Sequence, residues 1–191
     1  MGPSVLGDRI TPAKGSTMTT TSQTTLTGER ADLLQTLGKH RGFLRHTVQG
    51  LTDEQARLRP TASALTLGGL IKHVTASERN WADFIVGGPD AFPTFDESTW
   101  AQWAAEFQML PDETLEGLLA THAQIAARTD ELVRTLPDLD VSHPLPEAPW
   151  FEPGARWSAR RSLLHVLAET AQHAGHADIL RETIDGQKTM G

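Results

Sequence analysis

Cysteine is missing from all 191 residues, and its absence excludes several kinds of chemistry. The chain can form no disulfide, offers no thiolate to a metal ion and has no cysteine nucleophile. Any bound metal must therefore be held by histidine and carboxylate side chains. Any thiol that takes part in a reaction must be brought by a small molecule. With no disulfide to form, the cytoplasm is the expected compartment.

Long apolar runs and clusters of basic residues are also missing. No apolar run approaches the roughly 20 residues needed to span a bilayer, so no membrane association is expected. The 17 Lys and Arg face 24 Asp and Glu, which gives a formal charge of −7. Without a Lys/Arg cluster, nucleic acid is not an expected partner. A hydrophobic content of 38% and a charged content of 21% are typical of a soluble globular protein.

Composition divides the chain into two parts. Residues 1–25 are rich in Ser, Thr, Gly and Pro and lack the apolar core of a signal peptide, so we expect a disordered N-terminal segment. Met18 within it resembles an alternative start of translation. Residues 26–191 are expected to form one domain, because a single core serves roughly 100–200 residues.

Apolar residues in this domain recur at spacings near three, four and seven, the period of an amphipathic helix. Capping residues and helix breakers set the expected ends of four long helices: about 26–48, about 66–86, Asp112 or Glu113 to about Leu136, and about 158–184. Ser158 is the expected N-cap of the last helix, and Gly186 ends it. With long connections between them, these helices predict an all-α fold, a four-helix bundle.

The connections carry weaker signals. Thr52 and Gln55 have the spacing of a capping box for a short turn. Residues 98–109 suggest a further short helix. Residues 137–157 are rich in Pro, and no strand alternation is evident anywhere in the chain.

The last helix carries the most informative pattern. Glu169 and His173 lie four residues apart, so both side chains project from one helix face. His165 and His176 share this stripe, and at about 100° per residue all four fall within an arc of roughly 80°. A catalytic zinc site usually has three protein ligands and an open position, so a third ligand is needed from another helix. His73, bracketed by apolar residues on the second helix, is the leading candidate.

Other interpretations of these residues stay open at this point. A single His beside an apolar stripe is more often a hydrogen-bonded core residue than a ligand, and most Glu-x-x-x-His pairs are helix-surface hydrogen bonds. His40, His46 and His122, on the first and third helices, are expected to face solvent, and His143 falls in the Pro-rich connection. None of these four is a strong ligand candidate.

The chain resembles the DinB/YfiT-like superfamily of metalloenzymes, and within it the actinobacterial branch near mycothiol-dependent maleylpyruvate isomerase-type proteins. The likeness rests on residues 70–81, residues 169–182 and the turn at 50–56, and it covers roughly residues 26–186. It implies a four-helix bundle with a metal triad made by one His from the second helix and an i, i+4 pair from the last.

By matching positions, the resemblance makes His73, Glu169 and His173 the metal ligands. Many relatives carry His where this chain has Glu169, whereas the isomerase type carries Glu there. The implied cofactor is a divalent ion, with zinc first and nickel or iron as alternatives. Mycothiol is implied as cosubstrate.

Several further residues are expected to surround this site. His176 and His165 would orient the ligands by hydrogen bonding, and Trp81 would wall the pocket. Glu78 and Arg181 would either support the site or form a salt bridge between helices. The sequence also leaves open whether Trp100, Trp103, Trp150 and Trp157 cover the metal or fill the core, and whether Arg156, Arg160 and Arg161 bind a substrate carboxylate or form a solvated patch.

These expectations point to a divalent-metal-dependent enzyme, a thiol transferase or isomerase. It would activate a low-molecular-weight thiol for transfer to, or isomerisation of, an electrophilic small molecule. No single catalytic residue is predicted. A homodimer is a further expectation, because related bundles often dimerise. The alternatives are a non-catalytic metal-binding bundle that senses or binds a small molecule, and a purely structural metal whose shell is closed by His176 or His165.

Overall fold

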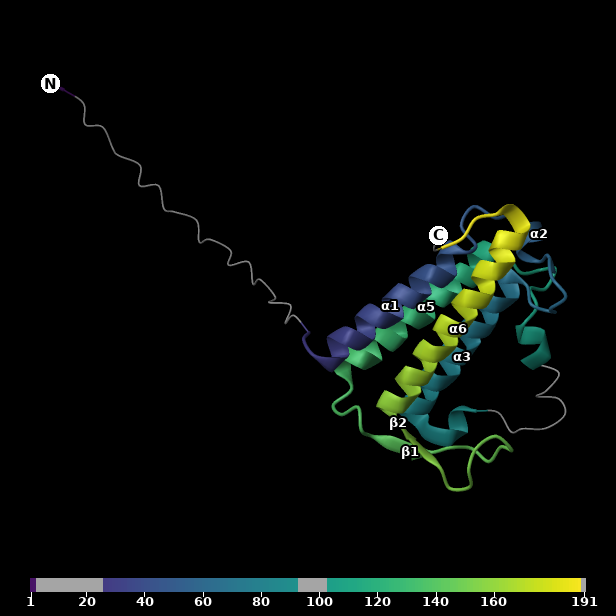
Figure 1. Cartoon of the computed structure of the whole chain (residues 1–191). Helices are drawn as coiled ribbons and strands as arrows, with labels where there is room; N and C mark the ends of the chain where they lie inside the picture. The colour runs from purple at the N-terminus through teal and green to yellow at the C-terminus, as the bar shows by residue number, and fades with distance from the viewer. Residues whose placement is uncertain (3–25, 93–102, 190–191) are drawn as a thin grey trace.

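Four long helices form a bundle in the computed structural model, which describes residues 1–2, 26–92 and 103–189 (Figure 1). They pack in a ring, with α1 and α3 each lying against both α5 and α6. The predicted all-α four-helix bundle is therefore confirmed. The long helices are α1 (Glu29–His46), α3 (Leu67–Gly87), α5 (Leu115–Thr135) and α6 (Ala159–Asp185). The short elements are α2 (Asp53–Ala56), η1 (Gly88–Ala91), β1 (Ser142–Pro144) and β2 (Arg156–Ser158).

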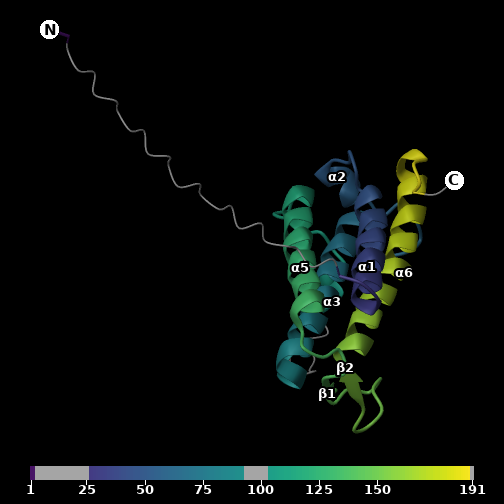
Figure 2. The same cartoon turned by 90° about the vertical axis from the view of Figure 1, so that its left-hand side faces the viewer.

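The helices run in an up, down, down, up order. α1 and α6 run toward the end of the bundle that carries α2, and α3 and α5 run toward the end that carries the strands (Figures 1 and 2). The chain between α3 and α5 must therefore travel back along the whole bundle. Its residues 103–109, which we call the strap, lie against the first turns of α3, where Lys72 Nζ donates to the Gln108 carbonyl at 3.3 Å.

Side-chain caps fix most helix ends where the sequence predicted them. Thr66, Thr114 and Ser158 each accept a hydrogen bond from the backbone N–H three residues on. Because Thr114 is the cap, α5 begins at Leu115, slightly later than expected. The capping box of Thr52 and Gln55 is present.

Two short strands interrupt the Pro-rich connection, although the sequence showed no strand alternation. β1 and β2 pair antiparallel, with Ser142 opposite Ser158. A three-residue strand is too short to display a period of two, which explains why the pattern was not visible. Of the short helix expected at 98–109, residues 103–106 are helical, and residues 98–102 lie outside the described residues.

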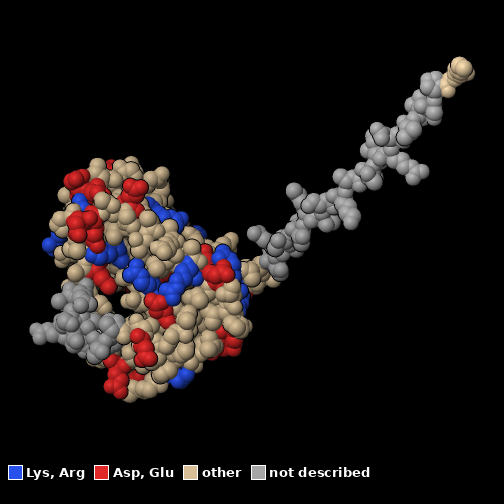
Figure 3. Space-filling view, turned by 180° about the vertical axis from the view of Figure 1, so that it is seen from behind, with Lys and Arg blue, Asp and Glu red and all other residues tan. Residues whose placement is uncertain are grey.

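Two apolar clusters make up the core. One surrounds Leu44 and Leu70 near α2, and the other surrounds Leu37 and Phe84 near the strands. No helix within the described ranges has the length and apolar character needed to cross a bilayer. On the face seen in Figure 3, basic side chains lie beside acidic ones.

Candidate metal centre

His73, Glu169 and His173 come together where α3 packs against α6. Oε2 of Glu169 lies 3.7 Å from Nε2 of His73 and 3.5 Å from Nε2 of His173. One ligand-type atom from each residue lies within 4.8 Å of the others, and the described part of the chain holds no second group of this kind. The two helices thus place the three sequence-predicted ligands around one point.

The spacing of these atoms fits a metal ion. Ligands about 2.0–2.1 Å from a tetrahedral ion stand roughly 3.4 Å from one another, close to the two separations from Glu169. Nδ1 of His73 is buried and has no hydrogen-bond partner, so the imidazole is held by packing and leaves Nε2 for an ion. Two imidazoles and one carboxylate suit zinc, and the set also occurs with iron.

The local electrostatics favour an ionised carboxylate. Hydrogen bonding with His173, and then with His73, holds the pKa of Glu169 far below its usual range despite partial burial. Glu169 is therefore an anion at neutral pH. With a divalent ion, the two neutral imidazoles and this anion give the centre a net charge of +1.

His176 and His165 both lie next to the triad. Nδ1 of His176 lies 3.3 Å from Nδ1 of His173; one of these atoms must donate, and the pair fixes the ring so that Nε2 of His173 faces Glu169. Nε2 of His165 lies 3.9 Å from Oε1 of Glu169. Burial lowers the pKa of His165.

The strap contributes two residues that the sequence did not connect with the site. The ring of Phe107 stacks on the His73 imidazole with centroids 3.9 Å apart and planes at 21°. Oε2 of Glu106 lies 4.0 Å from the otherwise unpartnered Nδ1 of His73, and burial raises the pKa of Glu106. No spacing in the sequence relates these residues to His73, because their proximity arises from the return path of the connection.

Glu78 and Arg181 do not contact the triad and do not pair with each other, although Glu78 does form a salt bridge between helices, with Arg41 on α1. Glu78 is buried and binds the guanidinium of Arg41, whose Nε lies 3.2 Å from Oε2. Arg181 donates to the carbonyl of Thr47 at 2.9 Å and to the carboxylate of Asp185. Five positions beyond His73, Glu78 projects about 140° away around the helix and so enters the bundle interior.

The remaining histidines lie outside the centre. His122, expected to face solvent, is instead fully buried and contacts the Thr75 hydroxyl through Nδ1 at 3.2 Å. His143 contacts the Ile85 carbonyl through Nε2 at 3.3 Å. His46 is exposed and His40 partly exposed, both on α1.

The three arginines near the start of α6 have partners of their own. Arg160 pairs with Glu29 and Asp140. Arg156 donates to the Ser142 carbonyl at 2.6 Å. The guanidinium of Arg161 lies 4.0 Å from the centre of a neighbouring tryptophan ring. None of the three lines the cavity beside the triad.

That cavity has a volume of about 350 Å³, and His73, Trp81 and His165 are among its lining residues. Trp81 contacts His165 edge to face at 4.9 Å, as expected for a wall of the pocket. Trp103 and Trp150 also line it, whereas Trp157 stacks on Trp81. Trp100 lies outside the described residues.

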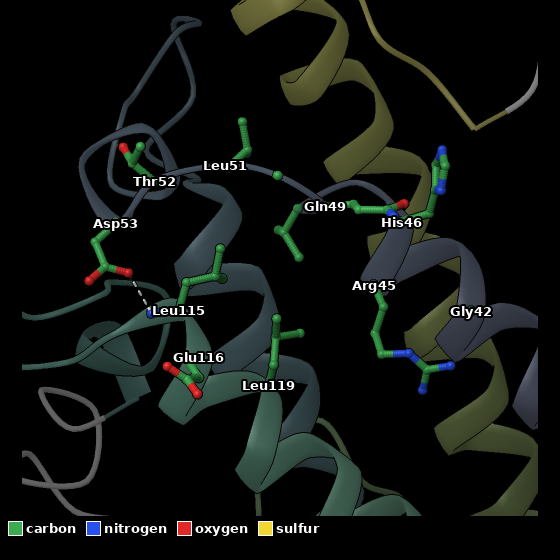
Figure 4. Close-up of a pocket in the computed structure, with 12 residues that line it drawn as sticks. Gly42, Arg45, His46, Gln49, Leu51, Thr52, Asp53, Leu115, Glu116 and Leu119 are labelled. Carbon is green, nitrogen blue, oxygen red and sulfur yellow. Dashed lines mark hydrogen bonds between the residues drawn. The ribbon is translucent and has the colours of Figure 1, made fainter.

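A larger hollow, about 720 Å³, lies at the other end of the bundle between α1, α2 and α5 (Figure 4). It is open to solvent, and two of its polar side chains bind backbone groups: Asp53 accepts from the Leu115 N–H at 2.7 Å, and Thr52 caps α2. No cluster of ligand-type atoms is found there within the described residues. Size alone therefore does not identify the site, and the smaller cavity beside the triad is the better candidate.

Comparison with known proteins gives one family and two similar structures. The family described as mycothiol-S-transferase matches residues 32–186. YfiT from Bacillus subtilis, described as a probable metal-dependent hydrolase with an unusual four-helix bundle topology, aligns with a TM-score of 0.60 at 18% identity over 83% of this chain and 89% of its own. A conserved protein from Enterococcus faecalis aligns with a TM-score of 0.59 at 16% identity over 85% of this chain and all of its own. At these identities both show the fold alone. No curated protein matches the chain in sequence.

Proposed function

The chain belongs to the mycothiol-S-transferase family, and on that premise we propose that it is a metal-dependent transferase. It would join a low-molecular-weight thiol of the mycothiol type to an electrophilic small molecule. The observation that carries this proposal is the convergence of His73, Glu169 and His173 within 4.8 Å, beside a cavity, in a chain without cysteine.

The chemistry of the ligand set supports a role for the triad in thiol activation. His73, Glu169 and His173 would hold a divalent ion, with zinc first and nickel or iron as alternatives, and such an ion would favour the thiolate form of an incoming thiol. Glu169 offsets part of the ion's charge, and His176 holds the ring of His173. His165 lines the cavity, and its Nε2 lies 3.9 Å from Oε1 of Glu169, which supports the proposal that it takes the thiol proton.

The first test is metal content. The protein purified with metal is expected to hold about one divalent ion per chain, and His73→Ala and His173→Ala are each expected to lose it. His46→Ala, which removes an exposed histidine on α1, is the matched control and should keep the ion. Retention of full metal by both triad variants would overturn the assignment.

The second test is turnover. With mycothiol and an electrophile, chelation should abolish the enzymatic rate and added zinc should restore it. Turnover that persists unchanged in metal-free protein would contradict the mechanism. Metal and small-molecule binding without any turnover would instead favour the non-catalytic binding module.

A further inference from the structure

Aromatic rings dominate the cavity beside the triad. Its volume of about 350 Å³ is near the lower end of the roughly 300–1,000 Å³ typical of small-molecule sites. The rings come from α3, the strap and the two connections: Trp81, Phe92, Trp103, Phe107, Trp150 and Phe151. Such walls favour a flat ligand, because stacked and edge-to-face contacts are available on several sides.

The charge of the cavity is equally informative. Its described lining includes no Lys or Arg, and its ionisable members are His73, His165 and Glu106. Glu169 adds a second carboxylate within the triad. A carboxylate ligand would thus lose hydration without gaining a basic partner from these walls.

We propose that the electrophile is an uncharged planar aromatic or conjugated molecule, and that carboxylic acids are poor substrates. This inference rests on the proposed function, because it names the substrate class of the same site. The inference also favours thiol transfer over isomerisation of maleylpyruvate. Maleylpyruvate is a dicarboxylate, and the described cavity walls contain no Arg or Lys to pair with its charges.

A matched pair of aryl chlorides tests the inference during turnover. Methyl 4-chloro-3,5-dinitrobenzoate is neutral, and 4-chloro-3,5-dinitrobenzoate carries a carboxylate in place of the ester on the same ring, with the same two nitro groups beside the chlorine. In both, the thiolate sulfur forms a bond to the ring carbon that carries chlorine, chloride leaves with the bonding electron pair, and the thiol proton passes to the buffer. Each kcat/KM is divided by the uncatalysed rate constant, which removes the difference in intrinsic reactivity.

The ratio of kcat/KM to the uncatalysed rate constant is expected to be at least tenfold larger for the neutral aryl chloride than for its carboxylate analogue. An equal or larger ratio for the carboxylate would overturn the inference while leaving the proposed function intact. No metal-dependent turnover of either compound would count against the proposed function, and the substrate class would then be decided by binding.

Binding is measured in metal-free protein, because a bound ion could itself hold a carboxylate. Methyl 2-naphthoate and 2-naphthoate, which do not react, are titrated against the tryptophan fluorescence of the chain, to which Trp81 in the cavity wall contributes. The ester is expected to bind at least tenfold more tightly. Equal or tighter binding of the acid would refute the inference whatever the catalytic result.

A cation introduced into the wall provides an independent check. Asn80→Arg, at a partly exposed position that lines the cavity, is expected to reduce the preference for the ester at least threefold. Gln124→Arg, exposed on α5, adds the same charge elsewhere and should leave the preference unchanged. If Gln124→Arg reduced the preference for the ester over the acid as much as Asn80→Arg does, the charge of the cavity walls would not determine that preference and the inference would fail.

Discussion

The carboxylate of Glu169 lies between the two imidazoles of the proposed metal centre and contacts both. It is the anionic member of the set and determines how much charge an ion retains. By the resemblance described above, many relatives carry histidine at this position. The carboxylate of Glu169 would distinguish this chain from them. Under the proposed function, Glu169 would therefore set both the affinity of the centre for its metal ion and the acidity of a thiol bound there.

Glu169→Gln should weaken zinc binding by roughly 100-fold or more, beyond the 10–100-fold that loss of a supporting hydrogen bond typically costs. The amide keeps the size of the side chain but removes its charge. Competition with a fluorescent zinc chelator measures the change. Glu182→Gln, exposed on the same helix, should bind zinc as the unaltered protein does. Equal affinity of Glu169→Gln and the parent would remove Glu169 from the ligand set.

Glu106 is not one of the three proposed ligands, but its Oε2 lies 4.0 Å from Nδ1 of His73, on the side of the ring away from the proposed ion. Glu106→Ala is expected to weaken zinc binding by about 10–100-fold, because a carboxylate behind a ligating histidine orients the ring and raises its basicity. Glu106→Gln, which keeps the size of the side chain and a polar oxygen facing Nδ1 of His73, should recover part of that loss. Unfolding of the metal-free variants should match the parent, and a large fall in their stability with unchanged zinc affinity would contradict the role.

Spacing in the sequence pointed to Glu169 and His173 on one helix and to His73 in an apolar context, and the family resemblance then selected these three residues as the predicted ligands. Spacing could not find Phe107 or Glu106, whose contacts depend on where a distant connection packs. It also misplaced His122, since one isolated histidine on an amphipathic helix carries too little pattern to fix the face it occupies. Periodicity in the sequence indicates which face of a single helix is buried. The contacts of Phe107, Glu106 and His122 depend instead on how two elements pack against each other, which periodicity does not show.

At the scale of elements, the strap depends on a pair of glycines at the start of α3. A Cβ atom at Gly69 would lie 1.9 Å from the backbone oxygen of Phe107, and one at Gly68 would lie 2.5 Å from the sulfur of Met109. Only glycine allows the strap to approach so closely. Because these two positions have no side chain, the strap can pack close enough to α3 to bring Phe107 and Glu106 next to His73. The glycines themselves do not contact the metal centre.

Gly69→Ala should destabilise the protein by about 1–3 kcal/mol, the usual cost of overpacking, although alanine is normally the better helix residue. Gly38→Ala on α1 meets nothing within 4 Å and should stabilise by about 0.5–1 kcal/mol. Urea unfolding compares the two variants. A stabilised Gly69→Ala protein would show that the strap does not need this close approach.

The helices themselves were largely predictable. Threonine and serine caps, apolar periodicity and Gly186 set their ends to within a few residues. The strand pair and the course of the connection were not predictable, because β1 and β2 are only three residues long and lie among prolines. Their pairing is fixed by tertiary contacts at the start of α6.

At the scale of the whole molecule, the bundle interior contains a polar network as well as an apolar core. Arg41 bridges Glu78 on α3 and Asp130 on α5. His122 is buried nearby with its Nε2 atom unpartnered, and burial, together with Arg41 and Arg45, lowers its pKa from 6.5 to about 4. The folded protein therefore holds this imidazole neutral under conditions in which the unfolded chain protonates it.

Stability of the metal-free protein should fall as pH drops from about 6.5 to about 4, because the unfolded chain binds the extra proton in that window. Below about pH 4 both states are protonated and this contribution, about 3 kcal/mol in all, is lost. Urea unfolding at a series of pH values measures the slope. His122→Gln should flatten it and His46→Gln, at an exposed site, should not; identical slopes in the two variants would refute the assignment.

The triad joins α3 to α6, two helices with 71 residues between them, from 88 to 158. An ion bound at the proposed centre would act as a reversible cross-link between the two helices, and it would bind only the assembled bundle. At 100 times its dissociation constant, such a ligand adds about 2.7 kcal/mol to folding stability. The lifetime of the protein against proteolysis would then follow the supply of metal in the cell, so that scarcity would lower its abundance as well as its activity.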